Sequence, residues 1–342
     1  MERPERRARP PVKVLYVGGA GRSGSTLLDL VLGELPGFFP VGELKYVWQR
    51  GVLGNELCGC GEPFLSCPFW TEVGEKAFGG WETFDVERVL ELERAVDRHA
   101  YIPLMRARSP WPAYGGRFSA FVEMLEELYA AIAEVSGASV VVDSTKRPST
   151  AFLLRHLQGV DLRFVQLVRD SRGVAFSWSK RVKRPEVVEG VEFMPRYDAL
   201  KASVRWMGNN SLFHVLARLG VPGIRVRYES LIREPRTEVE RVVDHLAENV
   251  PPGALDFLER SEVELKTNHI VAGNPVRLGG RTLNLRLDDA WKEQMDRRQK
   301  SLVVLLTWPL LLQYGYLGSS SDESNGTPRS AAPETHDGER RL

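Results

Sequence analysis

The sequence predicts an α/β fold in which a doubly wound, mainly parallel sheet forms the middle of three layers. Short runs rich in β-branched residues alternate with longer segments of helical periodicity, which is typical of parallel strands joined by crossover helices. The first of these runs ends in a glycine-rich loop at residues 18–24, and a helical pattern follows directly. A strand, a glycine loop and a helix in this order are typical of a phosphate-binding loop.

Four apolar runs are the predicted strands of this sheet. They are VKVLYV, SVVVD, LRFVQLV and IRVRY, at residues 12–17, 139–143, 162–168 and 224–228. Helical patterns are expected at 25–35, 84–108, 117–135, from about 171, at 197–220 and at 237–247. Pro148 suits the first turn of a further helix, and residues 184–196 are expected to form a loop. The apolar run 302–312 is too short for a membrane span and contains Pro309, so a buried terminal helix is predicted.

Composition indicates a folded globular protein without a charge-driven partner. The 342 residues are 43% hydrophobic and 27% charged, with a formal net charge of +1. This balance gives no reason to expect nucleic-acid or membrane binding. Any anionic ligand must therefore be bound by a local group of donors and cations. One domain is expected over 12–317, between a disordered basic arm at 1–11 and a disordered polar tail at 318–342. The first ten residues lack the apolar core of a secretory signal, so a cytoplasmic location is expected.

The three cysteines all lie in the segment CGCGEPFLSC, as Cys58, Cys60 and Cys67. A reducing compartment is the expectation, and thiols this close together are compatible with part of a metal site or with one disulfide plus a free thiol. A complete structural zinc site usually needs four ligands at paired spacings. A structural role without a metal is therefore favoured at this segment.

The glycine loop fits the phosphate-loop pattern GxxxxGK[ST] except at one position. Residues 19–26 read GAGRSGST, so Ser25 stands where the pattern has lysine, and the nearest cation is Arg22. Backbone N–H groups at a helix N-terminus favour an anion, and a guanidinium can bind two oxygens of one anion. The absent lysine argues against ordinary kinase chemistry on a triphosphate. The expected anion ligands are Gly21, Arg22, Ser23, Gly24, Ser25 and Thr26.

Together with a second segment, this loop resembles a known family. GAGRSGSTLL is similar to the 5′-phosphosulfate loop of sulfotransferases that use 3′-phosphoadenosine-5′-phosphosulfate (PAPS). FVQLVRDSRGVAFSWSK, at 164–180, resembles their 3′-phosphate segment, which has an arginine at a strand end and a serine eight residues later, here Arg169 and Ser177. Because ligands of open α/β sheets bind at the carboxyl ends of strands, Arg169 is expected over the same crevice as the loop.

The resemblance implies further contacts to the donor. Tyr228, in a YE pair after the IRVR strand, would contact the adenine, and Arg277 in the late loop HIVAGNPVRLGGR would close over the 3′-phosphate, with Arg281 as a weaker candidate. The tryptophan that follows the loop in the cytosolic branch is absent here, and the cysteine segment lies outside that branch. The resemblance is therefore nearer to the carbohydrate, tyrosyl-protein and bacterial branches.

Sulfuryl transfer requires a base for the acceptor proton and positive charge near the leaving 5′-phosphate. Glu43 is the expected base, because tyrosyl-protein and bacterial members carry a catalytic glutamate in a similar place after the first helix. Lys146, in VVVDSTKRP, matches a lysine that holds the bridging oxygen or the acceptor, and Arg22 would stabilise the leaving phosphate. The expected nucleotide product is adenosine 3′,5′-bisphosphate (PAP), and no metal is expected.

Two other functions stay open from the residues alone. An ATP- and Mg²⁺-dependent small-molecule kinase is the alternative, because SVVVD resembles the acidic strand end that binds Mg²⁺ in nucleoside triphosphatases. A non-catalytic phosphate-loop module would need Glu43 and Lys146 to face away from the crevice. The expected acceptor is a small molecule, glycan, lipid or peptide with a hydroxyl or amine, and the oligomeric state is not predicted. Candidate aromatic residues for its pocket, or for core packing, are Trp70, Trp81, Tyr101, Trp111, Phe193 and Tyr197.

Overall fold

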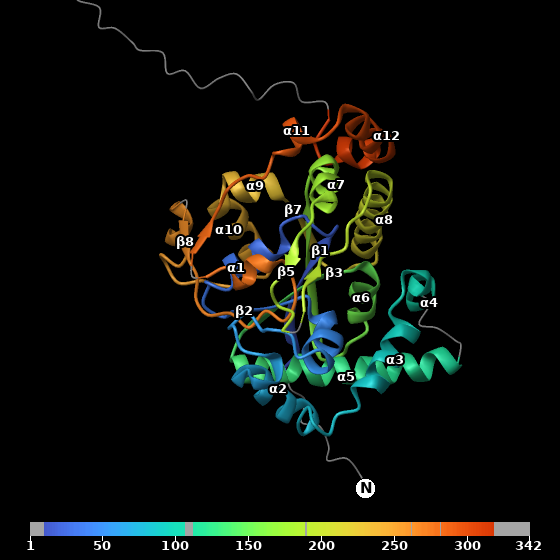
Figure 1. The fold of residues 1–342 in the computed structure, drawn as a ribbon. Helices are drawn as coiled ribbons and strands as arrows, with labels where there is room; N and C mark the ends of the chain where they lie inside the picture. Colours follow the sequence, from blue (N-terminus) through green and yellow to red (C-terminus); the bar gives the residue numbers. More distant parts are fainter. Residues whose placement is uncertain (1–9, 107–111, 189, 261, 281, 318–342) are drawn as a thin grey trace, which may run out of the picture.

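A five-stranded sheet forms the centre of the computed structural model, which describes residues 10–106, 112–188, 190–260, 262–280 and 282–317. The strand order is β2-β3-β1-β4-β7, and every pair of neighbours runs parallel. The predicted doubly wound α/β fold is therefore confirmed (Figure 1). The strands are β1 (Val12–Gly19), β2 (Phe38–Gly42), β3 (Val140–Lys146), β4 (Val160–Val168) and β7 (Gly223–Arg227).

Alternate residues of β1 face two different helical layers. Val14 and Tyr16 belong to a core built with α5, α6 and α8, whereas Leu15 and Val17 belong to a core built with α1 and α10. This period of two is what a strand buried on both faces requires. The helices of the two layers are α5 (Pro112–Ser136), α6 (Pro148–Leu154) and α8 (Ala199–Arg218) on one face, and α1 (Ser25–Leu32) and α10 (Pro235–His245) on the other.

β2 is a strand that the sequence pattern did not predict. Its five residues, FFPVG, contain Pro40, and a proline inside a short apolar run argues against a central strand. β2 is an edge strand that pairs only with β3, so the missing N–H of Pro40 is tolerated there. Because β2 ends at Gly42, it delivers Glu43 to the carboxyl edge of the sheet.

The helix expected over 84–108 is divided at a buried aspartate. α3 (Val86–Val96) ends before Asp97, and η4 (His99–Tyr101) and α4 (Ile102–Arg106) follow. The Asp97 carboxylate accepts hydrogen bonds from Lys45 at 3.1 Å and from Thr150 at 2.6 Å. These tertiary bonds favour a non-helical backbone at this position over continuation of the helix.

Other short elements complete the described chain. Between β2 and α3 lie η1 (Leu44–Tyr46), η2 (Val47–Leu53), η3 (Phe64–Ser66) and α2 (Pro68–Phe78). After β4 come α7 (Ser171–Ser179) and the hairpin β5 (Lys183–Arg184) and β6 (Glu192–Phe193), which lies where a loop was expected. The C-terminal part contains α9 (Tyr228–Arg233), η5 (Asp256–Glu259), β8 (Glu262–Glu264), η6 (Pro275–Leu278), β9 (Thr282–Asn284), α11 (Trp291–Gln294) and α12 (Arg297–Gln313).

The terminal helix α12 is buried along one face only. Val303 and Leu311 are fully buried, whereas Leu305 and Trp308 are exposed, so the predicted buried terminal helix is confirmed for one face and wrong for the other. Among the described residues, no helix is long and apolar enough to cross a bilayer. The expected tail at 318–342, and the expected arm apart from residues 10 and 11, lie outside the described residues.

Candidate functional site

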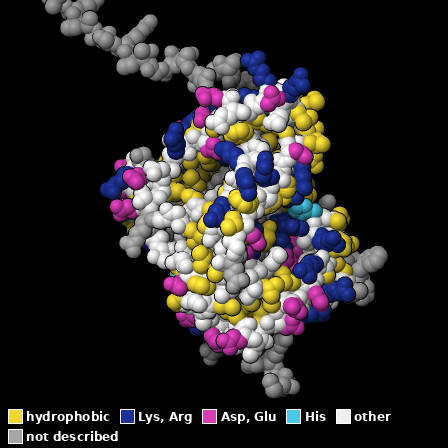
Figure 2. Space-filling model, in the orientation of Figure 1, with side chains coloured by type: hydrophobic (Ala, Val, Ile, Leu, Met, Phe, Trp, Pro, Cys, Tyr) yellow, Lys and Arg dark blue, Asp and Glu magenta, His cyan; other side chains and the backbone are white. Residues whose placement is uncertain are grey.

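A cavity of about 520 Å³ lies at the carboxyl ends of β1, β3 and β4. Its size is within the range of pockets that hold drug-sized ligands. Figure 2 shows Lys and Arg side chains gathered on one face of the molecule. The basic residues that line the cavity are Arg22, Arg50, Lys146, Arg147, Arg169 and Arg205, and the acidic ones are Glu43 and Asp288.

The glycine loop joins β1 to α1 and forms one wall of this cavity. Gly21, Gly24 and Thr26 are among its lining residues. Gly24 has a φ of 92°, and a Cβ placed there would lie 2.6 Å from Cδ2 of Tyr228. Only glycine fits this turn without strain, because it needs both the left-handed conformation and the close ring. Gly21 and Gly24 therefore bring the start of α1 to the cavity wall.

Arg22 occupies a strained position that its neighbours hold in place. Its φ is 71°, which a residue with a side chain adopts only at a cost. The guanidinium of Arg169 donates to the main-chain oxygen of Arg22 at 3.2 Å, and the Arg22 guanidinium lies over the Trp178 ring at 4.9 Å. Burial lowers the pKa of Arg22, and the charge of Glu43 opposes this effect.

Two polar atoms of the loop have no partner within the described chain. They are Nε of Arg22 and the hydroxyl of Ser23, and both are buried. Buried polar groups of native proteins are normally hydrogen-bonded, and an unpaired one calls for a ligand or other explanation. Arg22 lines the cavity, whereas Ser23 is buried and does not line it. The unpaired N–H of Arg22 at the cavity wall fits a phosphate-like group.

Arg169 lies at the end of β4, the strand next to β1. Its guanidinium lies over the Tyr228 ring at 4.5 Å and donates to the main-chain oxygen and carboxylate of Asp288 at 2.6 and 3.0 Å. Burial acts to raise the pKa of Asp288, but the hydrogen bond and charge of Arg169 outweigh it and leave the pKa lowered. Ser177, on α7, lines the same cavity. The loop and the Arg169 segment thus meet in one cavity.

Glu43 and Lys146 form an ion pair inside the cavity. Nζ of Lys146 lies 2.8 Å from Oε1 of Glu43 and 2.9 Å from the main-chain oxygen of Ser144. The Lys146 backbone is left-handed, with a φ of 66°, and both side chains of the pair line the cavity. The non-catalytic reading required these two side chains to face away, and they do not.

Asp143 is turned into the core and away from the cavity. It is 1% exposed and accepts hydrogen bonds from the Tyr129 hydroxyl at 2.6 Å and from the Thr145 backbone at 2.8 Å. Burial also raises the pKa of this carboxyl group. Its oxygens are committed to core partners, so the strand end that suggested a kinase does not present a Mg²⁺ ligand to the cavity.

Two predicted donor contacts lie elsewhere or outside the described residues. Arg277 is 2% exposed and donates to the main-chain oxygens of Ile270 at 2.8 Å and Leu57 at 2.9 Å. It does not line the cavity, because these two carbonyls hold its guanidinium in the interior. Arg281 lies outside the described residues.

Of the remaining predicted residues, some line the cavity, some are buried in the core and one lies outside the described residues. Tyr228 is the first residue of α9 and lines the cavity, and its hydroxyl accepts a hydrogen bond from the Asp288 backbone at 3.2 Å. Tyr197 also lines the cavity. Trp70 and Trp81 are buried in the core with Trp48 and Phe64, so core packing is the correct alternative for them. Trp111 lies outside the described residues.

Several cavity residues were missed by the sequence pattern. Trp178 follows Ser177 directly and donates to the main-chain oxygen of Gly21 at 3.2 Å, and the adjacency in sequence could have indicated it. Arg205 and Asn209 face the cavity from α8, where their spacing of four places them on one helical face. Asp288 lies in an irregular segment, and no local pattern marks its pairing with Arg169.

A protein-family model described as the sulfotransferase family matches residues 15–252. Similar solved structures include the sulfotransferase domain of the Synechococcus PCC 7002 olefin synthase, with 16% identity, a TM-score of 0.47, and 92% of this chain and 98% of that chain covered. The sulfotransferase domain of the curacin biosynthetic pathway has 15% identity, a TM-score of 0.47, and coverages of 87% and 98%. Sulfotransferase STF9 from Mycobacterium avium has 12% identity, a TM-score of 0.42, and coverages of 92% and 79%. No curated protein matches the chain.

Proposed function

Because the chain belongs to the sulfotransferase family, we propose that it transfers the sulfuryl group of PAPS to an acceptor hydroxyl or amine. The observation that carries this proposal is one cavity lined by the phosphate loop, by Arg169 with Ser177, and by the Glu43–Lys146 pair. Two anion-binding segments beside an acid–base pair suit a donor that has phosphates at both ends of its ribose. The family supports sulfuryl transfer in general, and the donor and the base are our proposal.

The proposed donor site uses both basic segments. The loop from Gly21 to Thr26 would bind the 5′-phosphosulfate through backbone N–H groups, with Arg22 as its cation. Arg169 and Ser177 would bind the 3′-phosphate. Tyr228 lines the cavity between these segments and would contact the nucleoside.

The proposed reaction is an in-line displacement at sulfur. The acceptor oxygen forms a bond to sulfur while the bond between sulfur and the bridging oxygen of the 5′-phosphate breaks, so PAP leaves. Glu43 accepts the acceptor proton, and Lys146 donates a hydrogen bond to the bridging oxygen as its charge develops. Protein cations fill the role that Mg²⁺ has in phosphoryl transfer.

The acceptor enters from the part of the cavity that the donor leaves open. Tyr46, His99 and Tyr197 line the cavity, and they offer rings and hydrogen-bonding groups rather than additional acidic charge. We propose a hydroxyl- or amine-bearing small molecule, glycan, lipid or peptide as the acceptor. Burial is the main reason that the pKa of His99 is lowered, and the charge of Arg147 adds to it, which favours the neutral imidazole at this wall of the cavity.

A ligand-induced thermal shift tests this function directly. PAP without metal should raise the melting temperature, because a ligand at 100 times its Kd stabilises the folded state by about 2.7 kcal/mol. ATP with Mg²⁺ at the same concentration should give a smaller shift. A larger shift with ATP and Mg²⁺ than with PAP would refute the proposal in favour of a kinase.

A further inference from the structure

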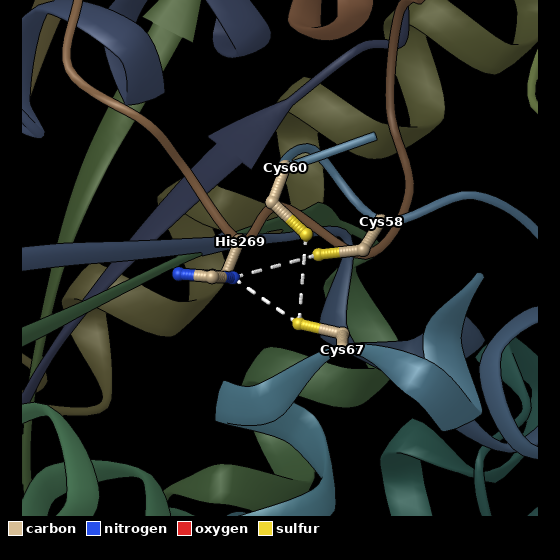
Figure 3. Close-up of side chains that lie close together, drawn as sticks. All are labelled: Cys58, Cys60, Cys67 and His269. Carbon is tan, nitrogen blue, oxygen red and sulfur yellow. Dashed lines mark hydrogen bonds between the residues drawn. The ribbon is translucent and has the colours of Figure 1, made fainter. Parts of the chain in front are cut away.

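The three cysteines meet a histidine that lies about two hundred residues away in the sequence. Cys58 and Cys60 lie in the segment before η3, Cys67 lies directly before α2, and His269 lies in the late loop before η6. The three Sγ atoms and a ring nitrogen of His269 all lie within 4.8 Å of one another. Figure 3 shows these four side chains converging on a common centre.

The distances within this cluster match those of ligands around one tetrahedral metal ion. Nδ1 of His269 lies 3.2 Å from Sγ of Cys67 and 3.8 Å from Sγ of Cys58, and the Sγ atoms of Cys60 and Cys67 are 3.7 Å apart. With Zn–S and Zn–N bonds of the usual length, two sulfurs of a tetrahedron lie about 3.7 Å apart, and a sulfur and a nitrogen about 3.5 Å. The side chains therefore need little movement to bind an ion.

The histidine ring is held in its orientation by neighbouring groups. It stacks on Phe69 with ring centroids 5.1 Å apart, and Trp70 donates from its indole to the main-chain oxygen of His269 at 3.0 Å. A fixed ring orientation favours metal binding by a histidine. Nδ1 consequently points at the sulfurs without a rotamer change (Figure 3).

The backbone around the cysteines packs closely against the late loop. Gly59 donates to the main-chain oxygen of Ile270 at 3.1 Å, and a Cβ on Gly59 would lie 1.8 Å from Oδ1 of Asn268. Gly61 has a φ of 92° and donates back to the main-chain oxygen of Cys58 at 2.9 Å, which closes a turn between the first two cysteines. Both glycines of the CGCG segment are therefore required by the geometry of the cluster.

A buried cation balances the charge that a metal-bound cluster would carry. Three thiolates and one Zn²⁺ have a net charge of −1, and a buried charge needs a partner. Arg277 supplies it, because its guanidinium is buried and donates to the main-chain oxygens of Leu57 and Ile270, the residues next to Cys58 and His269. This gives Arg277 a role beside the cysteine cluster in place of the donor contact that the resemblance implied.

We propose that Cys58, Cys60, Cys67 and His269 bind one Zn²⁺ as a structural site. Thiolate and imidazole ligands select zinc, and four protein ligands leave no open position for catalysis. The ion fixes the late loop, whose Ala272 oxygen accepts from the Glu43 backbone at 3.0 Å. The proposal is independent of the proposed function, since it concerns a cluster that does not line the cavity.

Metal content of the purified full-length chain tests the site. We expect about one zinc per chain by elemental analysis, and less than about a tenth of that in Cys67→Ser and His269→Ala. His269→Cys keeps four ligands, now all thiolates, and should retain the zinc, whereas His245→Ala, at a histidine of α10 that is not part of the cluster, should be unchanged. Full zinc occupancy in Cys67→Ser and His269→Ala would overturn the proposal.

Cobalt provides a readout that does not depend on any variant folding. Wild-type chain stripped with a chelator and reloaded with Co²⁺ should show the intense visible bands of tetrahedral cobalt and a thiolate charge-transfer band, at one ion per chain. A wild-type chain that carries no zinc and takes up neither ion, or in which two of the cysteines form a disulfide instead, would also overturn the proposal.

Discussion

Glu43 and Lys146 are the residues on which the proposed chemistry depends. Glu43→Gln keeps the size of the side chain and an oxygen that can accept from Lys146 2.8 Å away, but it removes the proton acceptor. We expect PAPS turnover to fall by about 100-fold or more, with PAP affinity unchanged. Turnover is measured as PAP release, and affinity by calorimetry.

Arg169→Ala is the matched comparison for this prediction. It removes the guanidinium at the end of β4 and should weaken PAP binding, while leaving the Glu43–Lys146 pair intact. If Glu43→Gln and Arg169→Ala lost the same amount of PAP affinity, Glu43 would be a binding residue rather than the base.

The carboxylate of Asp288 competes with the proposed 3′-phosphate for Arg169. It lies 3.0 Å from Nη2 of Arg169, so two anions would share one cation when the nucleotide binds. Asp288→Asn should therefore bind PAP several-fold more tightly, as measured by calorimetry. Asp289→Asn is the control, because Asp289 is a neighbouring carboxylate paired with Lys292 instead. Weaker PAP binding in Asp288→Asn would show that the carboxylate supports the site.

Asp29 predicts a pH dependence of stability. It is fully buried in α1, and burial raises its pKa from 3.8 to about 8, against the hydrogen bond from Ser144. The folded chain then holds a proton that the unfolded chain releases, so this contribution to stability is present below pH 3.8 and is lost as the pH rises to about 8.

Asp29→Asn removes this titration while keeping the size of the side chain. The melting temperature of the variant relative to wild type should rise progressively between about pH 5 and pH 8 in a thermal melt series. A constant difference over this range would mean that Asp29 is charged in the folded chain.

Elements with strong local signals were predicted correctly, and those set by distant contacts were not. β1, β3, β4 and the glycine loop follow from apolar runs and glycine spacing, because their burial on both faces requires continuous apolar sequence. β2 was missed, since its short run contains Pro40 and only the edge position makes it a strand.

Within the candidate site, too, residues in local motifs were predicted and residues placed by distant contacts were missed. Arg22 and Arg169 were found through motifs that lie within one strand–loop–helix unit each. Asp288 pairs with Arg169 across more than a hundred residues, and Arg277 binds carbonyls of two separate segments. Such partners depend on how distant segments pack together, and no local spacing encodes that.

Arg184 joins the β5–β6 hairpin to Glu56, which lies two residues before Cys58. Its guanidinium binds Glu56 at 2.6 Å, Glu186 at 3.1 Å and Glu192 at 2.5 Å, and Glu56 and Glu186 are mostly buried. Arg184→Met leaves these carboxylates without their cation, and breaking a buried pair costs about 3 kcal/mol. We expect a lower melting temperature and faster proteolytic cleavage near the hairpin.

Lys183→Met is the matched control for the hairpin, because it removes a neighbouring exposed cation that belongs to β5. Its melting temperature and cleavage rate should stay near those of wild type. Equal behaviour of Arg184→Met and Lys183→Met would mean that the carboxylates find other partners.

At the scale of the whole molecule, the charge is nearly balanced while the cavity is basic. The chain has a net charge of +1, yet six Lys and Arg residues line the cavity against two acidic ones. Attraction of a nucleotide therefore acts over short range and is screened by salt.

Raising the KCl concentration from about 50 mM to about 500 mM shortens the Debye length from roughly 14 Å to roughly 4 Å. This change should weaken PAP binding at least several-fold. The melting temperature of the ligand-free chain should change little over this range, and salt-independent PAP binding would contradict a charge-driven site.

The direct pairing of β1 with β4 has a consequence for how such a chain can diversify. Gly19 lies opposite Leu167 in this pair, so backbone bonds set the separation of the two segments proposed to bind the donor. Further walls of the cavity come from outside that unit, from Tyr46, Arg50 and His99, which follow β2, and from Met194 and Pro195, which follow β6. Substitutions in these walls can consequently change which acceptor binds, while the β1–β4 pairing keeps the two proposed donor-binding segments at the same separation.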